Sequence, residues 1–387
     1  MSTFYADFHV HIGRAQGQPV KMAAAATLTL ANLLQHASEK KGIHIVCVID
    51  GVCPPVQVEV RELMERGELV PMRGGGLSYQ GKLTVILGAE VEIAGPYGGA
   101  AHFGCWFGDL SAAADFSAWL ATVQKNPGLS SQRARTTAVE LQRQVRERDG
   151  LFIIHHAFTP HKGMYGNCVR HMADMVNPEW VDAVELGLSA DTDMADCLEE
   201  LSGFTFLSNS DAHSLPKIAR EYNRLELADA SFEQVRQALR RSGQARVTGN
   251  YGLTPALGKY HRSACKRCGN PWEPGQTRCA CGSDKVVMGV YDRLVVIRDM
   301  DKPVHPSHRP PYVHQVPLEF VPGLGPKTRA RLLDAFGSEM AVLHQATESD
   351  LEEVVGAELA RRIEDARSGR MAVTAGRGGV YGKLRVE

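Results

Sequence analysis

Short runs of β-forming residues alternate with longer helical stretches over the first 250 residues of this 387-residue chain. The β-type runs lie at 42–50, 82–93, 150–158, 181–188 and 204–213. Helical patterns at 28–42 and 130–150 each end on a glycine, as helix C-termini often do. Such alternation favours parallel strands joined by helices, and short runs with two apolar faces are typical of buried strands. We therefore expect an α/β barrel, closed or partly closed, over residues 1–250.

The rest of the chain predicts smaller modules, because 387 residues are too many for one ordinary core. Residues 251–297 are polar and turn-rich and contain four of the nine cysteines. Prolines in residues 298–317 forbid a regular helix and predict an extended linker. Residues 318–387 carry two helical stretches, each introduced by glycine.

The charge balance and the apolar pattern indicate a soluble cytoplasmic protein with no membrane partner. The 43 basic side chains nearly cancel the 44 acidic ones, so any polyanion must be bound by a local cluster of charge. No apolar run approaches the roughly 18 to 20 residues of a membrane span, and the N-terminus lacks a signal-peptide pattern. Free cysteines scattered through apolar segments suit a reducing compartment.

Side chains that can bind metal come in pairs, two residues apart, at the ends of three predicted strands. The pairs are His9 and His11, Glu90 and Glu92, and Asp211 and His213. Residues i and i+2 of a strand share a face, so each pair projects together. Imidazole and carboxylate donors suit zinc, manganese or iron, and several carboxylates allow two ions to be bridged. Buried ionisable groups in this number need charge compensation, so we predict a metal cluster.

Further imidazoles and one more carboxylate belong to the same strands. His102 adds an imidazole, and so does one histidine of the adjacent pair His155 and His156. Neighbouring strand residues face opposite ways, so we expect only one of that pair in the pocket. Asp7 shares the strand face of His9, and three roles are open for it: ligand, orienting group or core carboxylate.

A cysteine quartet forms the second metal-type pattern. Its members are Cys265, Cys268, Cys279 and Cys281. The spacing is zinc-ribbon-like, with two tight turns that each present two thiolates to one Zn2+, and Gly282 accommodates the short spacing of the last pair. Four sulfur ligands leave no position for water, so a structural site is expected. The alternative is four reduced surface cysteines.

Residues 321–333 predict a glycine hairpin between two helices. Gly323 and Gly325 form the turn, and Lys327 and Arg329 begin the second helix. Glycines let a backbone approach phosphate, and the free N–H groups of a helix start bind it. The pattern resembles the helix-hairpin-helix DNA-binding motif, and residues 352–363 look like a degenerate second copy. The alternative is an ordinary αα-hairpin used for packing or protein contact.

The strand-end motifs together resemble a known superfamily. "DFHVHIG", "VID", "GAEVE", "AHFG", "HHAF" and "SDAH" occur in the order of the PHP (polymerase and histidinol phosphatase) motifs. The resemblance implies a distorted (β/α)7 barrel that holds up to three metal ions. It implies that the first ion is bound by His9, His11, Glu90 and Asp211. The second would be bound by Glu90, His102 and His156, since the family's "AHP" pattern aligns with "HHA", and His213 would reach the third.

Two departures from the family pattern concern the third ion. The usual "TDH" is replaced by "IDG" at residues 49–51, and the "RAQGQPVKM" stretch at 14–22 carries no histidine. Asp50, or Cys53 three residues later, is the candidate substitute.

The order of barrel, cysteine module and helical tail resembles the endonuclease Q family of DNA-repair nucleases. The likeness is carried by "HAFTP" at 156–160, "VELGLSAD" at 184–191, "SNSDAHS" at 208–214, "GKYH" at 258–261 and "GGVYGKL" at 378–384. It implies incision of DNA 5′ to a deaminated base (uracil, hypoxanthine or xanthine) or an abasic site.

We expect metal-assisted hydrolysis, in which two or three divalent ions (Zn2+, Mn2+ or Mg2+) activate a water and neutralise phosphate charge. The expected catalytic residues are His9, His11, Glu90, His156 and Asp211. Glu92 and Glu185 are candidates to orient ligand imidazoles. The lesion would be flipped from the stack, and the glycine-rich segment 73–81 is a candidate to line its pocket. The alternative for that segment is a flexible hairpin turn.

Two other functions are open. The chain could be another PHP phosphoesterase, either a DNA exonuclease or a small-molecule phosphatase, or a DNA-binding protein whose barrel has lost catalysis. A zinc module and a DNA-type hairpin favour a polymer substrate over a small metabolite. Damaged DNA is therefore the expected partner. A sliding clamp is left open as a second partner, although the sequence has no convincing clamp-binding peptide.

Overall fold

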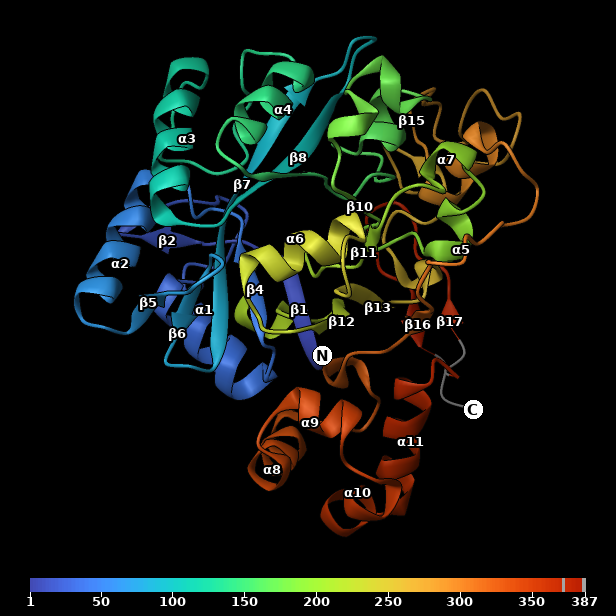
Figure 1. Ribbon diagram of the computed structural model, residues 1–387. Helices are drawn as coiled ribbons and strands as arrows, with labels where there is room; N and C mark the ends of the chain where they lie inside the picture. The colour runs from blue at the N-terminus through green and yellow to red at the C-terminus, as the bar shows by residue number, and fades with distance from the viewer. Residues whose placement is uncertain (371–372, 385–387) are drawn as a thin grey trace.

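A curled sheet of twelve strands forms the centre of the computed structural model, which describes residues 1–370 and 373–384 (Figure 1). Along the sheet the strands follow the order β11 (Phe206–Leu207), β10 (Ala183–Glu185), β9 (Leu151–Ile154), β8 (Ala100–Phe107), β7 (Leu83–Ala94), β4 (Ile45–Val48), β1 (Ser2–Val10), β12 (Tyr222–Leu227), β13 (Arg246–Gly252) and β16 (Tyr312–His314). A hairpin of β5 (Leu69–Pro71) and β6 (Leu77–Tyr79) extends from β7. The curled mixed sheet fits the expected α/β barrel.

The strands do not all run parallel, which corrects part of the prediction. β4 is parallel to β1 and β7, and β9, β10 and β11 are parallel to one another. However, β8 is antiparallel to β7 and β9, and β12 is antiparallel to β1 and β13. A short turn joins β7 directly to β8, and strands connected so tightly pair antiparallel.

Apolar side chains cover both faces of the sheet. In β4, Val46 and Val48 lie in one buried cluster and Ile45 and Cys47 in another. Successive strand residues point to opposite faces, so both faces are packed. Helices surround the sheet (Figure 1); they are α1 (Leu30–Gln35), α2 (Pro54–Glu65), α3 (Leu110–Val123), α4 (Ala138–Arg146), α5 (Thr192–Ala195) and α6 (Phe232–Arg240).

Two predicted helices differ in outcome. A π-helical segment, His36–Lys41, extends α1 and ends at Gly42, whose φ is 73°, so the glycine end is confirmed. The helix predicted over 130–150 is shorter than expected, because the Thr137 side chain accepts a hydrogen bond from the Glu140 N–H at 3.1 Å and caps the start of α4. The preceding residues instead cross to the loop after β1, where Ser130 N donates to Val20 O at 2.9 Å.

The glycine-rich segment 73–81 is a hairpin connection and does not line the pocket described below. It joins β5 to β6, and Gly74 to Gly76 all have positive φ. Gly75 O accepts a hydrogen bond from Phe232 N at 3.0 Å, so the turn packs on the start of α6. The expectation of a pocket loop was therefore wrong, because the segment folds toward α6.

Smaller elements follow the barrel. The cysteine module contains β14 (Ala264–Cys265) and β15 (Val286–Val287) and leads into α7 (Val290–Ile297). The C-terminal region consists of α8 (Pro326–Phe336), α9 (Glu339–His344), α10 (Glu348–Val355), α11 (Ala357–Arg367), β17 (Val373–Thr374) and β18 (Lys383–Leu384). Residues 371–372 and 385–387 of the expected 318–387 region lie outside the described residues. Across the described ranges, the model contains no helix whose length and apolar character would let it span a membrane.

The segments after the barrel pack closely against it. The expected linker is extended, but its strand β16 pairs in parallel with β13, and Arg309 forms an ion pair of 2.8 Å with Asp196. In the helical region, His344 Nε2 lies 2.7 Å from the Tyr222 hydroxyl, and Glu339 pairs with Lys41 at 2.7 Å. The linker is therefore anchored along part of its length.

Candidate metal centre and adjoining pocket

The two histidines at the end of β1 each turn one ring nitrogen into the barrel. His9 and His11 are fully buried, and the Nε2 atom of each has no hydrogen-bond partner among the residues that the structure describes. Their Nδ1 atoms face carboxylates: Glu185 Oε2 lies 3.0 Å from His9 Nδ1, and Asp50 Oδ1 lies 3.2 Å from His11 Nδ1. A carboxylate at Nδ1 leaves the Nε2 lone pair free, which is the usual arrangement of a metal-binding histidine.

Glu90 of β7 lies between the histidines. Its Oε2 atom is 3.1 Å from His102 Nδ1 and 3.3 Å from both His9 Nε2 and His156 Nε2. Burial alone would raise the pKa of Glu90, but His102 and Lys21 hold it well below its usual range. A fully ionised carboxylate shared by three imidazoles is suited to bridging two cations.

Asp211 completes the first predicted ligand set. Its Oδ1 atom lies 3.4 Å from His9 Nε2 and 3.5 Å from His11 Nε2. Its φ is 46°, a left-handed conformation that costs energy for a non-glycine residue. The predicted ligands His9, His11, Glu90 and Asp211 thus converge on one point.

Asp7 holds the strained loop in place. Its Oδ1 atom accepts hydrogen bonds from His9 N at 3.3 Å and Ser210 N at 3.1 Å, and its Oδ2 atom accepts one from Ala219 N at 2.8 Å. These bonds fix the backbone on either side of Asp211. Of the three roles left open for Asp7, the geometry matches that of an orienting group.

Among the described residues of the barrel, four overlapping groups could hold a metal ion, each with its ligand atoms within 4.8 Å of one another. They are His9, His11 and Glu90; Glu90, His102 and His156; His11, Asp211 and His213; and His9, His155 and Glu185. The first three groups correspond to the three expected ions. Buried imidazole nitrogens without partners, together with ionised carboxylates, are the donors that first-row divalent ions prefer.

His155 corrects one expectation. It is fully buried, its Nδ1 atom lies 3.4 Å from Glu90 Oε2, and its ring centroid is 4.0 Å from that of His9. β9 ends at Ile154, and the φ of His156 is 28°, so strand alternation no longer separates the two histidines. Both therefore approach Glu90, and His155 is not an outward-facing neighbour.

The substitutes considered for the third ion do not face the centre as ligands. Asp50 Oδ2 accepts a hydrogen bond from Ile12 N at 2.6 Å. Its other oxygen lies beside Nδ1 of His11, the ring nitrogen that does not point into the metal centre. Cys53 precedes α2 and belongs to none of the groups of described residues that could hold a metal ion.

Sequence reasoning missed Lys21. Its ammonium Nζ lies 3.0 Å from Glu90 Oε1, and both Lys21 and Glu90 are hydrogen-bonded to the Ser131 hydroxyl. Ser131 was assigned to a helix and Lys21 to a loop noted only for lacking histidine. Neither residue type signals a metal site from sequence alone.

Glu92 contacts His102 of the second ligand group without belonging to that group. Its carboxylate is 3.6 Å from His102 Nε2 and forms ion pairs of 2.6 Å with Arg133 and 2.5 Å with Lys162. Burial would raise the pKa of Glu92, but hydrogen bonds from His102, Lys162 and Arg133 lower it to about 2. Glu92 and Glu185 therefore both contact ligand imidazoles, as residues that orient them would.

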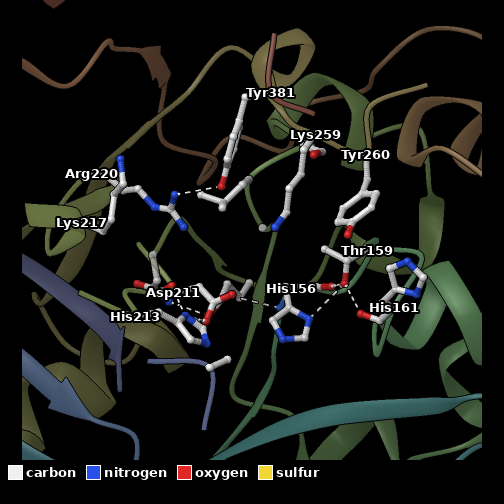
Figure 2. Close-up of a pocket in the computed structure, with 16 residues that line it drawn as sticks. His156, Thr159, His161, Asp211, His213, Lys217, Arg220, Lys259, Tyr260 and Tyr381 are labelled. Atoms are coloured by element: carbon white, nitrogen blue, oxygen red, sulfur yellow. Dashed lines mark hydrogen bonds and ion pairs between the residues drawn. The ribbon is translucent and has the colours of Figure 1, made fainter. Parts of the chain in front are cut away.

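A cavity of about 440 Å³ opens onto this centre (Figure 2). In Figure 2, His156, Asp211 and His213 lie on one side, and the opposite side is formed by Lys217, Arg220, Lys259, Tyr260 and Tyr381. The Lys259 ammonium lies 5.4 Å from the centroid of the Tyr260 ring and 5.7 Å from that of Tyr381. Cations and aromatic rings that line a cavity beside a metal centre suit a phosphate attached to a flat, π-rich group.

The wall opposite the metal centre is assembled from distant parts of the chain. Arg220 donates to Ser210 O at 2.8 Å, and its Nη1 atom lies 3.3 Å from the Tyr381 hydroxyl. Gly379 N donates to Lys259 O at 3.0 Å, which ties the C-terminal segment to the segment before the cysteines. These wall residues were not predicted individually. The quoted "GKYH" and "GGVYGKL" contain Lys259, Tyr260 and Tyr381, whereas Lys217 and Arg220 lie in none of the quoted motifs.

The four cysteines converge at the surface of the second module. Their closest sulfur pairs are Cys265 with Cys281 at 3.6 Å and Cys268 with Cys279 at 3.5 Å. Sulfur atoms about 2.3 Å from one tetrahedral Zn2+ would be about 3.8 Å apart, so the group fits such an ion. Gly282 has a φ of 83°, which lets the chain turn tightly after the closely spaced last pair.

The glycine turn precedes a helix, as predicted, but the described residues directly before it form no α-helix. A single 3-10 turn at Leu318–Phe320 precedes it, Gly323 has a φ of 84°, and α8 begins after Gly325. Gly323, Gly325 and Lys327 are exposed, whereas Arg329 is half-buried. A second glycine, Gly356, with a φ of 84°, joins α10 to α11 in the same manner.

Comparisons with known proteins give relatives over the full length of the chain. No protein-family model matches it. The uncharacterized protein YqxK of Bacillus subtilis is 46% identical over 389 residues, which span 100% of both chains. The crystal structure of the novel lesion-specific endonuclease PfuEndoQ from Pyrococcus furiosus has a TM-score of 0.84 and 29% identity, and covers 100% of this chain and 96% of that one. An endonuclease Q complex with a 27-mer duplex substrate, with an abasic lesion at the active site, has a TM-score of 0.86 and 29% identity and covers 100% and 97%.

Proposed function

Because the chain belongs to the PHP superfamily of metal-dependent phosphoesterases and resembles endonuclease Q over its whole length, we propose that it is a DNA-repair endonuclease. Its substrate is duplex DNA with a deaminated base (uracil, hypoxanthine or xanthine) or an abasic site. It hydrolyses the phosphodiester 5′ to the lesion. The observation that carries the proposal is the full-length likeness to a lesion-specific endonuclease together with the converging ligands of the barrel.

The metal ligands are proposed as follows. The first ion is held by His9, His11, Glu90 and Asp211, and the second by Glu90, His102 and His156. Bound ions supply an activated water and neutralise charge on the phosphate. Glu185 and Asp50 keep the Nδ1 protons of the two β1 histidines, so that both Nε2 atoms stay available as ligands.

The cavity receives the lesion-bearing nucleotide. Lys217, Arg220 and Lys259 bring positive charge to its wall, where they hold the phosphates on either side of the lesion. Tyr260 and Tyr381 offer rings on which an unstacked base or sugar can pack. The lesion must leave the duplex to reach the metal centre, which is easiest where base pairing is weakened.

The two smaller modules serve the same substrate. A structural Zn2+ at the four cysteines braces the segment carrying Lys259 and Tyr260, because Cys265 follows it closely in the chain. The exposed hairpin of Gly323, Gly325 and Lys327 contacts the DNA backbone away from the cut, and Arg329 supports it. The sliding clamp gains no support from the described residues or the comparisons.

Cleavage of defined duplexes tests the proposal. The purified protein is incubated with Mg2+ or Mn2+ and end-labelled duplexes that contain one deoxyuridine, one deoxyinosine, one abasic site or no lesion. One cut 5′ to each lesion and none in the intact duplex is expected. Degradation from the ends or turnover of small phosphate esters would indicate another phosphoesterase. DNA binding without turnover would indicate a DNA-binding protein whose barrel has lost catalysis.

A matched pair of variants tests the barrel as the source of the cut. His9→Ala removes a buried ligand nitrogen and should abolish cleavage. His36→Ala, on a half-buried helical position outside the barrel centre, should leave it unchanged. Cleavage by the His9→Ala protein would overturn the assignment of the metal centre.

A further inference from the structure

Lys21 places a positive charge inside the metal centre. Its side chain is only 13% exposed, and its Nζ atom lies 3.0 Å from Glu90 Oε1. Lys21 and Ser131 share a hydrogen bond, and Ser131 also donates to the same oxygen of Glu90. The ammonium is therefore held by two partners at the carboxylate that the proposed first and second ions share.

The two oxygens of Glu90 have different partners. Oε2 faces the imidazoles of His9, His102 and His156 at 3.1 to 3.3 Å. Oε1 faces Lys21 and Ser131, and the imidazole nitrogen near it, His11 Nε2, is 3.8 Å away. Oε2 is thus available to metal ions, whereas the charge of Oε1 is already balanced by the ammonium.

The backbone fixes Lys21 in this position. Lys21 N donates to Ile12 O at 3.0 Å, directly after the β1 histidines, and Lys21 O accepts from Ala24 N at 3.0 Å. The preceding residues form the hairpin of β2 (Arg14–Ala15) and β3 (Gln18–Pro19). Val20 O accepts from Ser130 N at 2.9 Å, which links the lysine loop to the segment carrying Ser131.

The third ligand group shares two of its three residues with the proposed first site. His11 and Asp211 also belong to the proposed first site, so only His213 is particular to the third. His213 Nδ1 already lies 2.9 Å from Asp211 O. The loop that carries Lys21 also reaches this group, because Ala25 N donates to His213 O at 2.8 Å. A dication bound here would be repelled by the like charge of the Lys21 ammonium.

We propose that the Lys21 ammonium takes the place of the third metal ion, so that the barrel binds two divalent ions and supplies the third positive charge itself. The inference rests on the proposed metal centre and not on the choice of lesion. It accounts for the loop at 14–22 without histidine and for Asp50, which turns to His11 Nδ1 instead of the centre. The ammonium also keeps Glu90 Oε1 neutralised when no metal is bound.

Anomalous diffraction from crystals of the full chain grown with excess Mn2+ locates barrel ions directly and separately from the cysteine site. Two barrel peaks, both beside Glu90, are expected for the wild type. A third wild-type peak beside Asp211 and His213 would overturn the inference. This result is independent of activity: two peaks in a protein that does not cut lesion DNA would reject the proposed function and leave the inference standing.

A substitution tests whether the lysine is what keeps the third position free. Lys21→His removes the ammonium and restores an imidazole to the loop, and a third peak is expected. Lys40→His, at an exposed position, is the matched control and should show two. Two peaks in the Lys21→His protein would also overturn the inference. If that variant does not fold, Lys21→Gln provides the same comparison, and the wild-type map decides by itself.

Discussion

Oε2 of Glu185 lies 3.0 Å from Nδ1 of His9, and neither side chain is exposed to solvent. Burial would raise the pKa of Glu185, but His9 beside it lowers that pKa to about 2, so the carboxylate is ionised. Asn209 donates to the same oxygen at 2.9 Å and fixes its position. Glu185 therefore determines which nitrogen His9 presents to the metal centre, although it lies 176 residues away in the sequence.

Glu185→Gln should weaken metal binding. The amide keeps the size of the side chain but loses the charge that favours the Nδ1 proton of His9, and comparable changes cost roughly 10- to 100-fold in metal affinity. Metal titration of lesion cleavage should show a higher half-saturating concentration and little loss at saturation. Glu179→Gln, at an exposed position, is the control. Equal metal requirements in the two variants would contradict this role.

A second prediction concerns pH and the docking of the C-terminal helices. His344 stacks on Tyr5 with ring centroids 4.3 Å apart, and burial, helped by Arg367 and Arg224, lowers its pKa from 6.5 to about 4. Between these values the unfolded chain holds more protons than the folded one, so the free energy of unfolding falls as the pH drops from about 6.5 toward 4. The loss is at most about 1.4 kcal/mol per pH unit.

Urea unfolding between pH 7 and pH 4.5 measures this effect. His344→Gln keeps a hydrogen-bonding group for the Tyr222 hydroxyl but does not titrate, so its stability should depend less on pH than that of the wild type. All other acid-sensitive groups are common to both proteins. Parallel pH profiles would show that His344 is not the sensitive group.

The paired ligands were predictable because they depend on local geometry. His9 lies in β1 and His11 directly follows its last residue, so the spacing of two residues is enough to direct both rings to the same side. The glycine end of the first helix needs only one turn of chain. The same local rule failed at His155, since it assumed that the strand continued past Ile154. A sequence pattern therefore predicts which residues share a face of a strand more reliably than it predicts where the strand ends.

Residues that meet only through the folding of distant segments could not be predicted from a local sequence pattern. Lys21 reaches Glu90 over 69 residues and Ser131 reaches it over 41. Their roles depend on two loops that meet only after the sheet has curled. The antiparallel placement of β8 was missed for a similar reason, because strand direction depends on the turn after β7 and not on the composition of either strand.

The cysteine site is expected to stabilise its module through one Zn2+. Cys279→Ser removes a buried thiolate and should cost one equivalent of zinc, measured by mass spectrometry of the metal. The region around residues 265–281 should then become sensitive to limited proteolysis while the barrel stays folded. Cys197→Ser, which replaces a half-buried thiol outside the quartet, should retain the zinc. Unchanged zinc content in Cys279→Ser would favour four independent surface cysteines.

Tyr381 should contribute to lesion binding through its ring. Stacking of a base on an aromatic side chain is worth about 1 to 3 kcal/mol, so Tyr381→Ala should weaken binding of lesion DNA by roughly 5- to 150-fold. Tyr381→Phe keeps the ring and loses only the contact of the hydroxyl with Arg220, so its loss should be smaller. Fluorescence anisotropy in a His9→Ala background avoids cleavage. Tyr97→Ala, at a residue 77% exposed, is the control, and equal losses at Phe and Ala would exclude stacking.

The exposed hairpin should bind DNA without regard to the lesion. Lys327 projects near the start of α8, where free N–H groups and a lysine can meet one phosphate. Lys327→Ala should weaken binding to damaged and intact duplexes equally. It should also reduce the magnitude of the slope of log affinity against log salt by about 0.9, the contribution of one phosphate contact. Lys302→Ala, at an exposed position of the linker, provides the control. An unchanged slope would mean that the hairpin serves packing or protein contact, because a phosphate contact always releases counterions.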